Sequence, residues 1–447
     1  MNLNKIASFI IVFIILSFFV FNNVYEEEQL TAEEKIYGLS LFWSEVKYNF
    51  AFFDRVPNLD WDSVYQEYIR EVMNTRTIKE YYDTLKLICA LLKDGHTSIE
   101  YPPFVEEQID YVPLAIRNFG KDLVITKVFN EQHVRSIPVG SYLLKIDDIN
   151  AYDYLLDFVY PYIPASSERK RIHNAARHIL SGNANEKLKI TIKTPYEEVE
   201  NLIVKRNYKS LNIKPDEILE YKKIDANFAY IAINSFDDPK IIAEFEKIVP
   251  YLMKAKGLII DVRKNAGGNS LFGYSIISWF TDEKIPVPKT ESREHIAIYK
   301  AWGNLSDQYF WFREFKKYAQ DKAWKKIEEL KLTTAKRTQI KCPIVVLFGI
   351  DTGSAAEAFL VALDCLDIGI LIGQPSAGVT GQPLSLNLPG GGRARICVGR
   401  NTYPDGKEFA GSGVQPDIFI EPKVEDIINR KDSELEKAIE ILKGRIK

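Results

Sequence analysis

The chain has 447 residues, and its 58 Lys and Arg residues against 61 Asp and Glu residues give a formal net charge of −3. Hydrophobic residues make up 46% and charged residues 27%, which excludes a disordered chain, a collagen-like fibre and a polytopic membrane protein. The near-neutral charge lacks the basic footprint of nucleic-acid-binding proteins, so no nucleic-acid partner is expected.

Residues 1–25 differ in composition from the rest. An uncharged apolar run at residues 6–21 follows Lys5 and precedes three glutamates at 26–28. At about 1.5 Å per residue a helix over this run is roughly 24 Å long, shorter than the ~30 Å hydrocarbon core of a bilayer. The run predicts a signal peptide or a marginal membrane anchor, with a buried helix as the remaining alternative; the lack of a small-residue cleavage site favours the anchor. We therefore expect an exported protein, anchored through residues 6–21 and facing the periplasm or extracytoplasmic space, or secreted if the segment is cleaved.

Two domains are predicted before residue 210. Residues 30–104 have helical periodicity, beginning with a capping box of Thr31 and Glu34 and ending at the polar turn Asp94-Gly-His-Thr97. Residues 105–208 form a strand-rich module of short alternating runs. Its strands are expected at 111–116, 123–128, 142–146 and 188–192, and one helix at 171–180.

Residues 216–423 predict a larger α/β domain. Expected strands at 228–233, 257–262, 343–348 and 368–373 alternate with expected helices at 240–255 and 354–366. This pattern is typical of layered proteins with a largely parallel sheet. An insertion at 283–341, with tryptophans among many lysines, predicts an amphipathic helical lid or brace, and residues 424–447 predict a final charged helix. The four cysteines stand singly in apolar stretches, which favours small buried side chains over metal ligands.

Ser354 is the first candidate catalytic residue, because it lies where a predicted strand gives way to a predicted helix. A hydroxyl on such a turn projects from the edge of the sheet, and the amides that follow it can bind a developing negative charge. A structural interpretation is equally concrete, since Ser354 and Glu357 have the spacing of a helix capping box. This stretch alone supports nucleophile and cap equally.

A nucleophilic serine needs a base and a site for the oxyanion. Among the five histidines only His96 lies in a tight polar turn that could hold an imidazole rigidly. Gly267 and Gly268 follow the expected strand 257–262 and allow a backbone amide to approach a substrate carbonyl closely. Taken singly, a solvated histidine and a plain strand-to-helix turn remain the alternative interpretations of these two sites.

Other site chemistries are excluded by spacing. Neither glycine-rich phosphate motif is present. The G-x-S-x-G context of α/β-hydrolases is missing around Ser354. His173 and His178 are five residues apart, which does not place them on one helix face, so they are not expected to form a metal pair. We therefore expect no metal and no organic cofactor.

Five motifs occur in order along the chain. They are Asp94-Gly-His-Thr97, Leu258-Ile-Ile-Asp-Val-Arg-Lys-Asn-Ala-Gly-Gly268, Gly353-Ser-Ala-Ala-Glu357, Gly373-Gln-Pro-Ser-Ala-Gly378 and Gly413-Val-Gln-Pro-Asp417. Together they resemble the S41 peptidases, the family of C-terminal processing (tail-specific) and tricorn-like proteases, over residues 31–423. The resemblance implies an α/β, ClpP/crotonase-like catalytic core and a PDZ-like fold for residues 105–208.

The resemblance also implies roles for single residues. Ser354 matches the family's nucleophile. One branch activates this serine with a downstream lysine, but Val379 stands at that place and no lysine lies between Ser354 and Gly406, so a Ser/Lys dyad is not expected. The tricorn-like branch uses a histidine ahead of the PDZ-like insertion, where His96 stands, and an ordinary histidine pKa of about 6.5 suits a general base.

The remaining members of the site are implied in the same way. The amides of Gly267, Gly268 and Ala355 match the oxyanion donors. The orienting glutamate of tricorn-like enzymes falls where this chain has Ala410. Glu408, two residues earlier, lies on the same face if the segment is a strand, and is expected to orient His96.

These assignments predict a serine endopeptidase or carboxy-terminal processing peptidase that cleaves protein or peptide substrates through an acyl-enzyme. The PDZ-like block suggests capture of a substrate C-terminus by strand addition. The competing interpretation is a catalytically inactive S41-like peptide-binding scaffold, in which Ser354 only caps a helix. An acyl-CoA-handling enzyme on the same type of core ranks third, because it explains neither the PDZ-like block nor the export segment.

Overall fold

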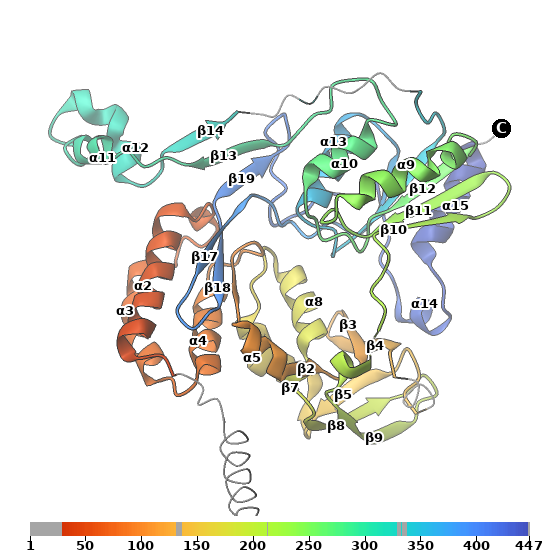
Figure 1. The fold of residues 1–447 in the computed structure, drawn as a ribbon, viewed down its shortest axis with the longest axis horizontal. Coiled ribbons are helices and arrows are strands. Elements are labelled where there is room, and N and C mark those ends of the chain that lie inside the picture. Colours follow the sequence, from red (N-terminus) through yellow and green to blue (C-terminus); the bar gives the residue numbers. More distant parts are fainter. Residues whose placement is uncertain (1–28, 131–135, 212, 329–331, 333–337, 446–447) are drawn as a thin grey trace, which may run out of the picture.

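The computed structural model describes residues 29–130, 136–211, 213–328, 332 and 338–445 (Figure 1). The predicted signal peptide or anchor, residues 1–25, lies outside these ranges. Within them, no helix is both long and apolar enough to cross a bilayer.

A six-stranded sheet forms the centre of the α/β domain. Its parallel strands, in spatial order, are β11 (Phe228–Ile233), β12 (Gly257–Asp261), β15 (Ile344–Phe348), β16 (Ile370–Gly373) and β20 (Ile418–Phe419), and β10 (Leu219–Lys223) pairs antiparallel with β11 at one edge. Strands β12 and β15 are buried along their whole length, which the apolar runs 258–260 and 344–348 favour. The four strands predicted for this domain are confirmed, with small shifts at their ends.

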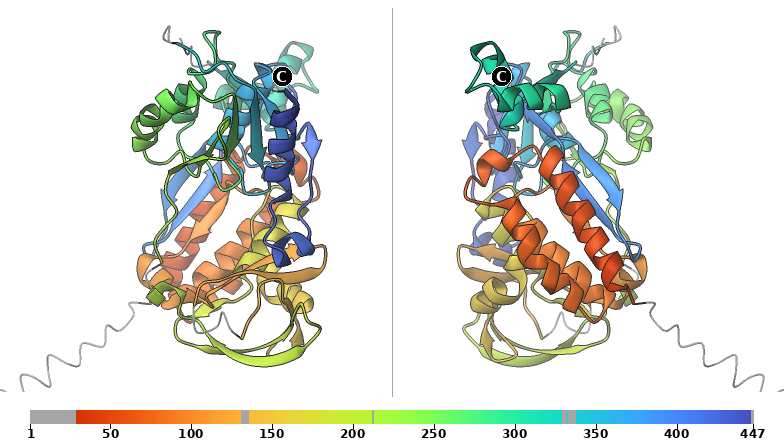
Figure 2. Two further views of the ribbon diagram at one scale, coloured as in Figure 1. Left: turned by 90° about the vertical axis from the view of Figure 1, so that its right-hand side faces the viewer. Right: turned by 90° about the vertical axis from the view of Figure 1, so that its left-hand side faces the viewer.

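Helices cover both faces of this sheet. One face carries α9 (Lys240–Leu252), α10 (Ser270–Ile277) and α13 (Ala355–Cys365), which share a hydrophobic cluster with the strands. The other face carries α15 (Ser433–Arg445), packed through Ala438 and Leu442; Figure 2 shows it across the sheet from α9. The single final helix of the prediction is two helices, α14 (Val424–Ile428) and α15. The break occurs where Asp432 accepts a hydrogen bond from the Leu435 amide at 3.0 Å, starting a new helix.

The N-terminal block contains three main helices, α2 (Ala32–Asn49), α3 (Trp61–Asn74) and α4 (Ile78–Ala90), and later the short α5 (Pro103–Gln108). The predicted capping box is confirmed, since Glu34 N donates to Thr31 Oγ1 at 3.2 Å and Thr31 N to Glu34 Oε2 at 2.8 Å. The block does not close on itself. It shares its hydrophobic cluster with the hairpin β17 (Pro383–Asn387) and β18 (Arg393–Cys397), and β1 (Ser98–Glu100) pairs with β18.

The strand-rich module has a six-stranded antiparallel sheet, on which α8 (Glu168–His178) packs. Five of its strands follow one another in space: β3 (Leu114–Phe119), β4 (Asp122–Val128), β5 (Tyr142–Ile146), β8 (Lys187–Lys193) and β9 (Val199–Lys205). The sixth, the short β6 (Ile149–Asn150), pairs with β5, and β2 (Ile109–Tyr111) pairs separately with β7 (Ser181–Asn183). The strand expected at 111–116 begins only at Leu114, because Pro113 has no amide hydrogen to pair.

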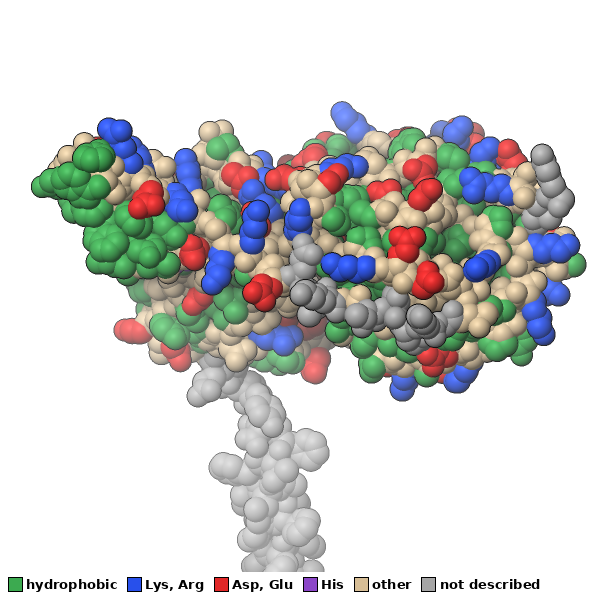
Figure 3. All heavy atoms as spheres, turned by 90° about the horizontal axis from the view of Figure 1, so that it is seen from above, with side chains coloured by type: hydrophobic (Ala, Val, Ile, Leu, Met, Phe, Trp, Pro, Cys, Tyr) green, Lys and Arg blue, Asp and Glu red, His purple; other side chains and the backbone are tan. Residues whose placement is uncertain are grey.

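The insertion forms an arm that projects from the molecule (Figure 1). A hairpin of β13 (Lys289–Arg293) and β14 (Trp324–Ile327) carries α11 (Ala297–Asn304), the 3₁₀ turn Phe310–Phe315 and α12 (Lys316–Ala319), and β19 (Gly399–Thr402) pairs with β13. Phe310 is 71% exposed, and Figure 3 shows hydrophobic side chains gathered at the end of the arm. No described residue of 283–341 lines the cavity beside Ser354 that is described below, so the lid stays a prediction. The arm does brace α2, since His295 contacts the Tyr48 carbonyl.

Candidate active site

Ser354 lies in the turn between β15 and α13, as predicted. Its backbone has φ 54° and ψ −119°, a conformation that residues other than glycine rarely adopt and that costs about 1–3 kcal/mol. Capping does not require this conformation, because N-cap residues ordinarily have extended backbones. The strain matches instead the sharp strand-to-helix turn that exposes the nucleophile in α/β-hydrolases.

Hydrogen bonds from neighbouring segments hold the strained turn. The Gly353 amide donates to the Asn265 carbonyl at 3.0 Å, and the Ser354 amide donates to the Val379 carbonyl at 3.0 Å. Thr352 Oγ1 donates to the carbonyl of Val262 at 2.8 Å. The position of Ser354 is therefore fixed from both the glycine turn and the segment that contains Val379.

Glu357 joins these segments from within the core, where its side chain is fully buried. Its carboxylate accepts hydrogen bonds from the amides of Ser354 (3.0 Å), Gly378 (2.7 Å) and Val379 (3.0 Å) and from the Ser376 hydroxyl. Burial raises the pKa of Glu357 to about 7, although all four donors favour the charged form. The sequence indicated only the capping partnership of Glu357; its contact with residues 376–379 is a tertiary one.

Gly267 and Gly268 differ in whether their backbone amides are free to bind an oxyanion. The amide of Gly267 already donates to Asn265 Oδ1 at 2.9 Å, so the prediction that Gly267 is an oxyanion donor does not fit this geometry. Gly267 provides space instead, because a Cβ there would lie 2.7 Å from Ser354 Cβ. Among the described residues no acceptor is bound to the amides of Gly268 and Ala355. These two amides are the available donors beside Ser354.

His96 is held by the loop that contains it. Asp94, only 2% exposed, accepts from the His96 amide at 3.1 Å and from the Thr97 hydroxyl at 2.7 Å. Ser166 of the strand-rich module accepts from the Gly95 amide at 3.0 Å and donates to Asp94 at 3.3 Å. The loop is therefore fixed partly by a different domain.

The imidazole of His96 lies in an environment that keeps it neutral. Burial lowers its pKa below the ordinary value, opposed by the charge of Asp94 and by the carbonyl groups of Thr380 and Gly381. Its Nδ1 atom is buried without a hydrogen-bond partner among the described residues. A neutral imidazole can accept a proton at neutral pH.

A cavity of about 660 Å³ brings the predicted residues together. His96, Gly267, Gly268 and Ser354 all line it, although His96 and Ser354 come from the helical block and the α/β domain. In the part of the chain that the structure describes, no group of three or more His, Cys, Asp or Glu side chains could hold a metal ion.

Glu408 is not part of this cavity. Its side chain is 59% exposed, with its carboxylate oxygens 4.0 Å from Arg55 Nη2 and 3.8 Å from Arg400 Nη1. Ala410, where the family's glutamate would fall, is buried, and its carbonyl accepts a hydrogen bond from Arg55 at 2.7 Å. The structure thus does not bring Glu408 to His96, and the carboxylate whose charge acts on the imidazole is Asp94.

Two lysines line the cavity that were not predicted from the sequence: Lys170 on α8 and Lys264 in the glycine turn. The ammonium of Lys170 is 2.6 Å from Asp351 Oδ1, and that of Lys264 is 2.6 Å from Asp216 Oδ2. Both amines are engaged by carboxylates, so neither is a free base beside Ser354.

Asp351 connects the Ser354 turn to α8. Besides Lys170, it contacts His173 Nε2 at 3.0 Å and Arg177 Nη1 at 3.1 Å. Burial alone would raise the pKa of Asp351, but the hydrogen bond from His173 and the charges of Lys170 and Arg177 hold it well below its usual range. The strand-rich module is therefore attached directly to the turn that carries Ser354.

Comparison with known proteins identifies the α/β domain. Residues 227–420 match the model of peptidase family S41. This region therefore has the sequence characteristics of an S41 peptidase domain. Over 168 residues it is 25% identical to the chloroplastic C-terminal processing peptidase of Tetradesmus obliquus, a match that spans 38% of this chain and 29% of that relative.

Solved structures agree with the S41 fold. Mature CPAF superposes with a TM-score of 0.72 at 15% identity, covering 92% of this chain and 97% of that one. The photosystem II D1 C-terminal processing protease superposes with a TM-score of 0.51 at 17% identity, covering 91% and 97%. At these identities the likeness establishes the fold.

Proposed function

We propose that this protein is a serine peptidase with Ser354 as nucleophile and His96 as general base. The strained Ser354 turn carries this proposal, because it opens into the same cavity as His96 and the glycine turn. A capping role accounts for the pairing of Ser354 with Glu357. It does not account for the strain or for the assembly around it.

The chemistry follows from the groups in the cavity. Ser354 Oγ attacks the scissile carbonyl while His96 takes its proton. The amides of Gly268 and Ala355 bind the oxyanion of the tetrahedral intermediate. His96 then protonates the leaving amine, and it later deprotonates the water that hydrolyses the acyl-enzyme ester on Ser354.

Asp94 takes the orienting role that the sequence suggested for Glu408. It holds the His96 backbone, and its charge raises the pKa of the imidazole. A buried carboxylate stabilises the imidazolium that forms as Ser354 loses its proton. Asp94 acts on His96 without touching the substrate, so it is a positioning residue.

Peptide cleavage by the full chain tests the nucleophile and base. Ser354→Ala and His96→Ala should each lower kcat by roughly 10⁴-fold or more. Ser235→Ala is the matched control, because Ser235 lines the same cavity but bonds to Asp237 at 3.1 Å. A fluorophosphonate should modify wild type at Ser354 only. Absence of cleavage and of labelling in folded wild-type protein would overturn the proposal in favour of an inactive peptide-binding scaffold.

Endopeptidase activity and carboxy-terminal processing differ in whether cleavage depends on a free C-terminus of the substrate. We propose processing near a free C-terminus, supported by the likeness to processing peptidases. Matched peptides with free and amidated C-termini, analysed by mass spectrometry, test this point. Equal cleavage of both would assign an endopeptidase that ignores the terminus.

We propose that the protein is exported and tethered by residues 6–21, as the apolar run and its charged flanks suggest. Carbonate extraction of membranes from cells expressing the full chain, beside a variant lacking residues 6–21, tests this. Retention of wild type alone in the membrane pellet would support a tether. Release of a shortened wild-type chain would indicate a cleaved signal peptide.

A further inference from the structure

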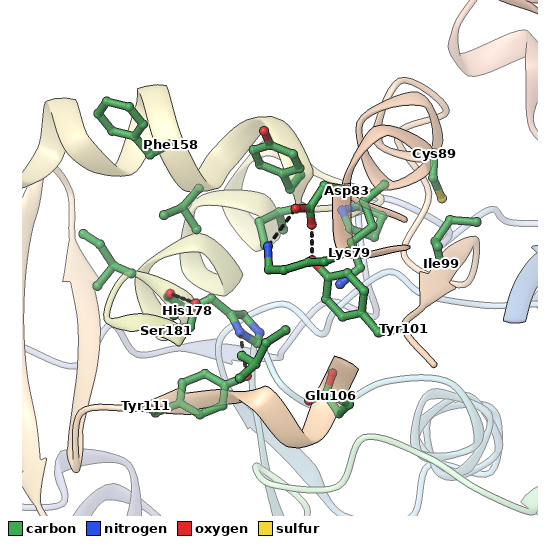
Figure 4. Close-up of a pocket in the computed structure, with 18 of the residues that line it drawn as sticks. Lys79, Asp83, Cys89, Ile99, Tyr101, Glu106, Tyr111, Phe158, His178 and Ser181 are labelled. Carbon is green, nitrogen blue, oxygen red and sulfur yellow. Dashed lines mark hydrogen bonds and ion pairs between the residues drawn. The ribbon is translucent and has the colours of Figure 1, made fainter. Parts of the chain in front are cut away.

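A second cavity of about 510 Å³ lies between the helical block and the strand-rich module (Figure 4). Helix α4 contributes Lys79, Asp83 and Lys86, and the C-terminal end of α8 contributes His178. It shares no lining residue with the catalytic cavity. We call it the α4–α8 cavity.

Most of the lining of the α4–α8 cavity is apolar or aromatic. The aromatic side chains are Tyr101, Tyr111, Tyr154, Phe158 and Tyr162, with Ile99, Ile109, Val159, Ile163 and Ile179 among the aliphatic ones. Phe158 is 54% exposed although it adjoins this surface. Cavities of this volume and composition are typical of sites for small molecules or short chain segments with an apolar body.

Among the described residues Lys86 forms no direct ion pair, although the charges of Asp83 and Glu106 favour its charged form. The Lys86 ammonium lies 3.2 Å from the centre of the Tyr101 ring, and among the described residues it has neither an ion pair nor a hydrogen bond. Burial lowers the pKa of Lys86 to about 8. A partly desolvated ammonium over one ring is incompletely stabilised, so an anion beside it would be favoured.

Of the two acidic residues in the cavity, Asp83 already has bonding partners. Asp83 pairs with Lys79 at 2.7 Å and accepts a hydrogen bond from the Tyr101 hydroxyl. Glu106, at the cavity wall, is exposed to solvent. These two carboxylates oppose a second negative charge, so the cavity fits one negative charge better than two.

His178 adds a neutral donor. Burial, followed by the charges of Arg177 and Lys86, lowers its pKa to about 4, so the imidazole is uncharged at neutral pH. Its Nδ1 lies 3.3 Å from the Tyr111 hydroxyl, and Figure 4 shows the two side chains facing each other. When that hydroxyl donates to Nδ1, Nε2 carries the proton and can donate to a ligand.

We propose that the α4–α8 cavity binds a monocarboxylate with an apolar body, and that Lys86 is the counter-ion of the carboxylate. The apolar part packs among the aromatic side chains, and His178 contributes a neutral hydrogen bond. Two sources supply this chemistry: a free amphipathic carboxylic acid, or the C-terminal carboxylate of a peptide that ends in an apolar residue. Only the peptide source depends on the proposed peptidase function.

Calorimetric titration of the full-length Ser354→Ala variant tests the site without turnover. The probes are octanoate, octanol, and a peptide ending in leucine with either a free or an amidated C-terminus. Octanoate or the free-acid peptide should bind at least tenfold more tightly than its uncharged counterpart. Octanoate binding alone assigns a free acid, and discrimination between the two peptides assigns a chain terminus. Equal affinity of charged and uncharged probes, or no binding of any probe, would overturn the proposal.

Substitutions locate the binding on Lys86. Lys86→Met should weaken binding of the charged probe at least tenfold and leave the uncharged probe unchanged. Lys121→Met is the matched control, since the Lys121 ammonium also lies over an aromatic ring, 5.9 Å from that of Tyr152, outside the cavity. If Lys86→Met does not fold, Ile109→Trp, which fills the cavity while keeping the charge, should abolish binding. Unchanged binding in the folded variant would place the ligand elsewhere and refute the proposal.

Discussion

The two cavities of this protein are built in different ways. The catalytic cavity combines His96 and two lysines with several glycines, a strained serine and loop amides, held by hydrogen bonds between separate domains. The α4–α8 cavity is made mostly of long aromatic, aliphatic and charged side chains on ordinary helices and strands. The first cavity restricts residue type at its glycine and serine positions, whereas the second tolerates many sequences.

This difference determines whether each cavity can be recognised from the sequence. A left-handed backbone, or a close approach of two chains, admits glycine almost alone and leaves a motif. A lysine or tyrosine on a helix face has the same local sequence whether it lines a cavity or faces solvent. The catalytic cavity is therefore visible in the sequence, and the α4–α8 cavity only in the structure.

Among the residues that shape the backbone of the catalytic cavity, Gly268 is expected to give a large effect. A Cβ on Gly268, whose φ is +123°, would lie 2.3 Å from the carbonyl carbon of Phe236. Gly268→Ala must displace the proposed oxyanion amide, so kcat should fall roughly 10²- to 10³-fold. Gly406→Ala is the control, because Gly406 also has positive φ (+97°) but open space around it. Comparable kcat values for the two variants in peptide hydrolysis would remove Gly268 from the oxyanion site.

Glu357 tests whether hydrogen bonds in the core maintain the catalytic backbone. The side chain of the Glu357→Gln variant has one acceptor oxygen where the carboxylate has two. Its NH₂ group then faces backbone or hydroxyl hydrogen-bond donors that it cannot satisfy. Leaving buried donors unpaired should lower the free energy of unfolding by about 2–4 kcal/mol, with a fall in kcat of roughly tenfold to a hundredfold as the Ser354 turn relaxes. Urea unfolding and steady-state kinetics measure both.

The control for Glu357 is Glu80→Gln. Glu80 lies at the same position of α4, three residues after the capping residue, and its carboxylate accepts from the Arg76 amide at 2.6 Å near the surface. This variant should lose at most about 1 kcal/mol. Equal losses would mean that Glu357 acts only as a helix cap.

These contrasts explain which sequence predictions succeeded. The strands of the α/β domain, the Ser354 turn and the glycine turn were predictable, because buried parallel strands and tight turns demand particular residue types. Lys170 could not be placed in the catalytic cavity, because it lines that cavity only through docking of α8 on Asp351. The side-chain alternation that favoured Glu408 fixes a face of a strand but not which neighbour that face meets.

The insertion also shows that local composition does not determine secondary structure. Its tryptophans and lysines suggested an amphipathic helix, yet β13 is a strand of five mostly polar residues. This strand exists because β14 and β19 pair with it on either side. Pairing between distant segments overrode the local composition.

The pH dependence distinguishes Asp94 from Glu408 as the group that acts on His96. The base must be neutral to accept a proton, and its pKa lies below the ordinary ~6.5, so kcat/KM should fall only as the pH drops below that value. Asp94→Asn removes a charge that raises this pKa, so the acidic limb should move about one unit lower, with a moderate loss of kcat. A limb that stays in place would remove Asp94 from the role proposed here.

Glu408→Gln should have the smallest effect. Its two arginine contacts, at 4.0 and 3.8 Å, are long and involve an exposed carboxylate, and such pairs are worth about 0–1 kcal/mol. We expect a change in kcat of less than about threefold and no displacement of the acidic limb. A loss near the ~10⁴-fold seen when an orienting carboxylate is removed would show that Glu408 moves to His96 when substrate binds. That result would return the orienting role to the residue that strand geometry favoured, and would leave Asp94 as a support of the loop.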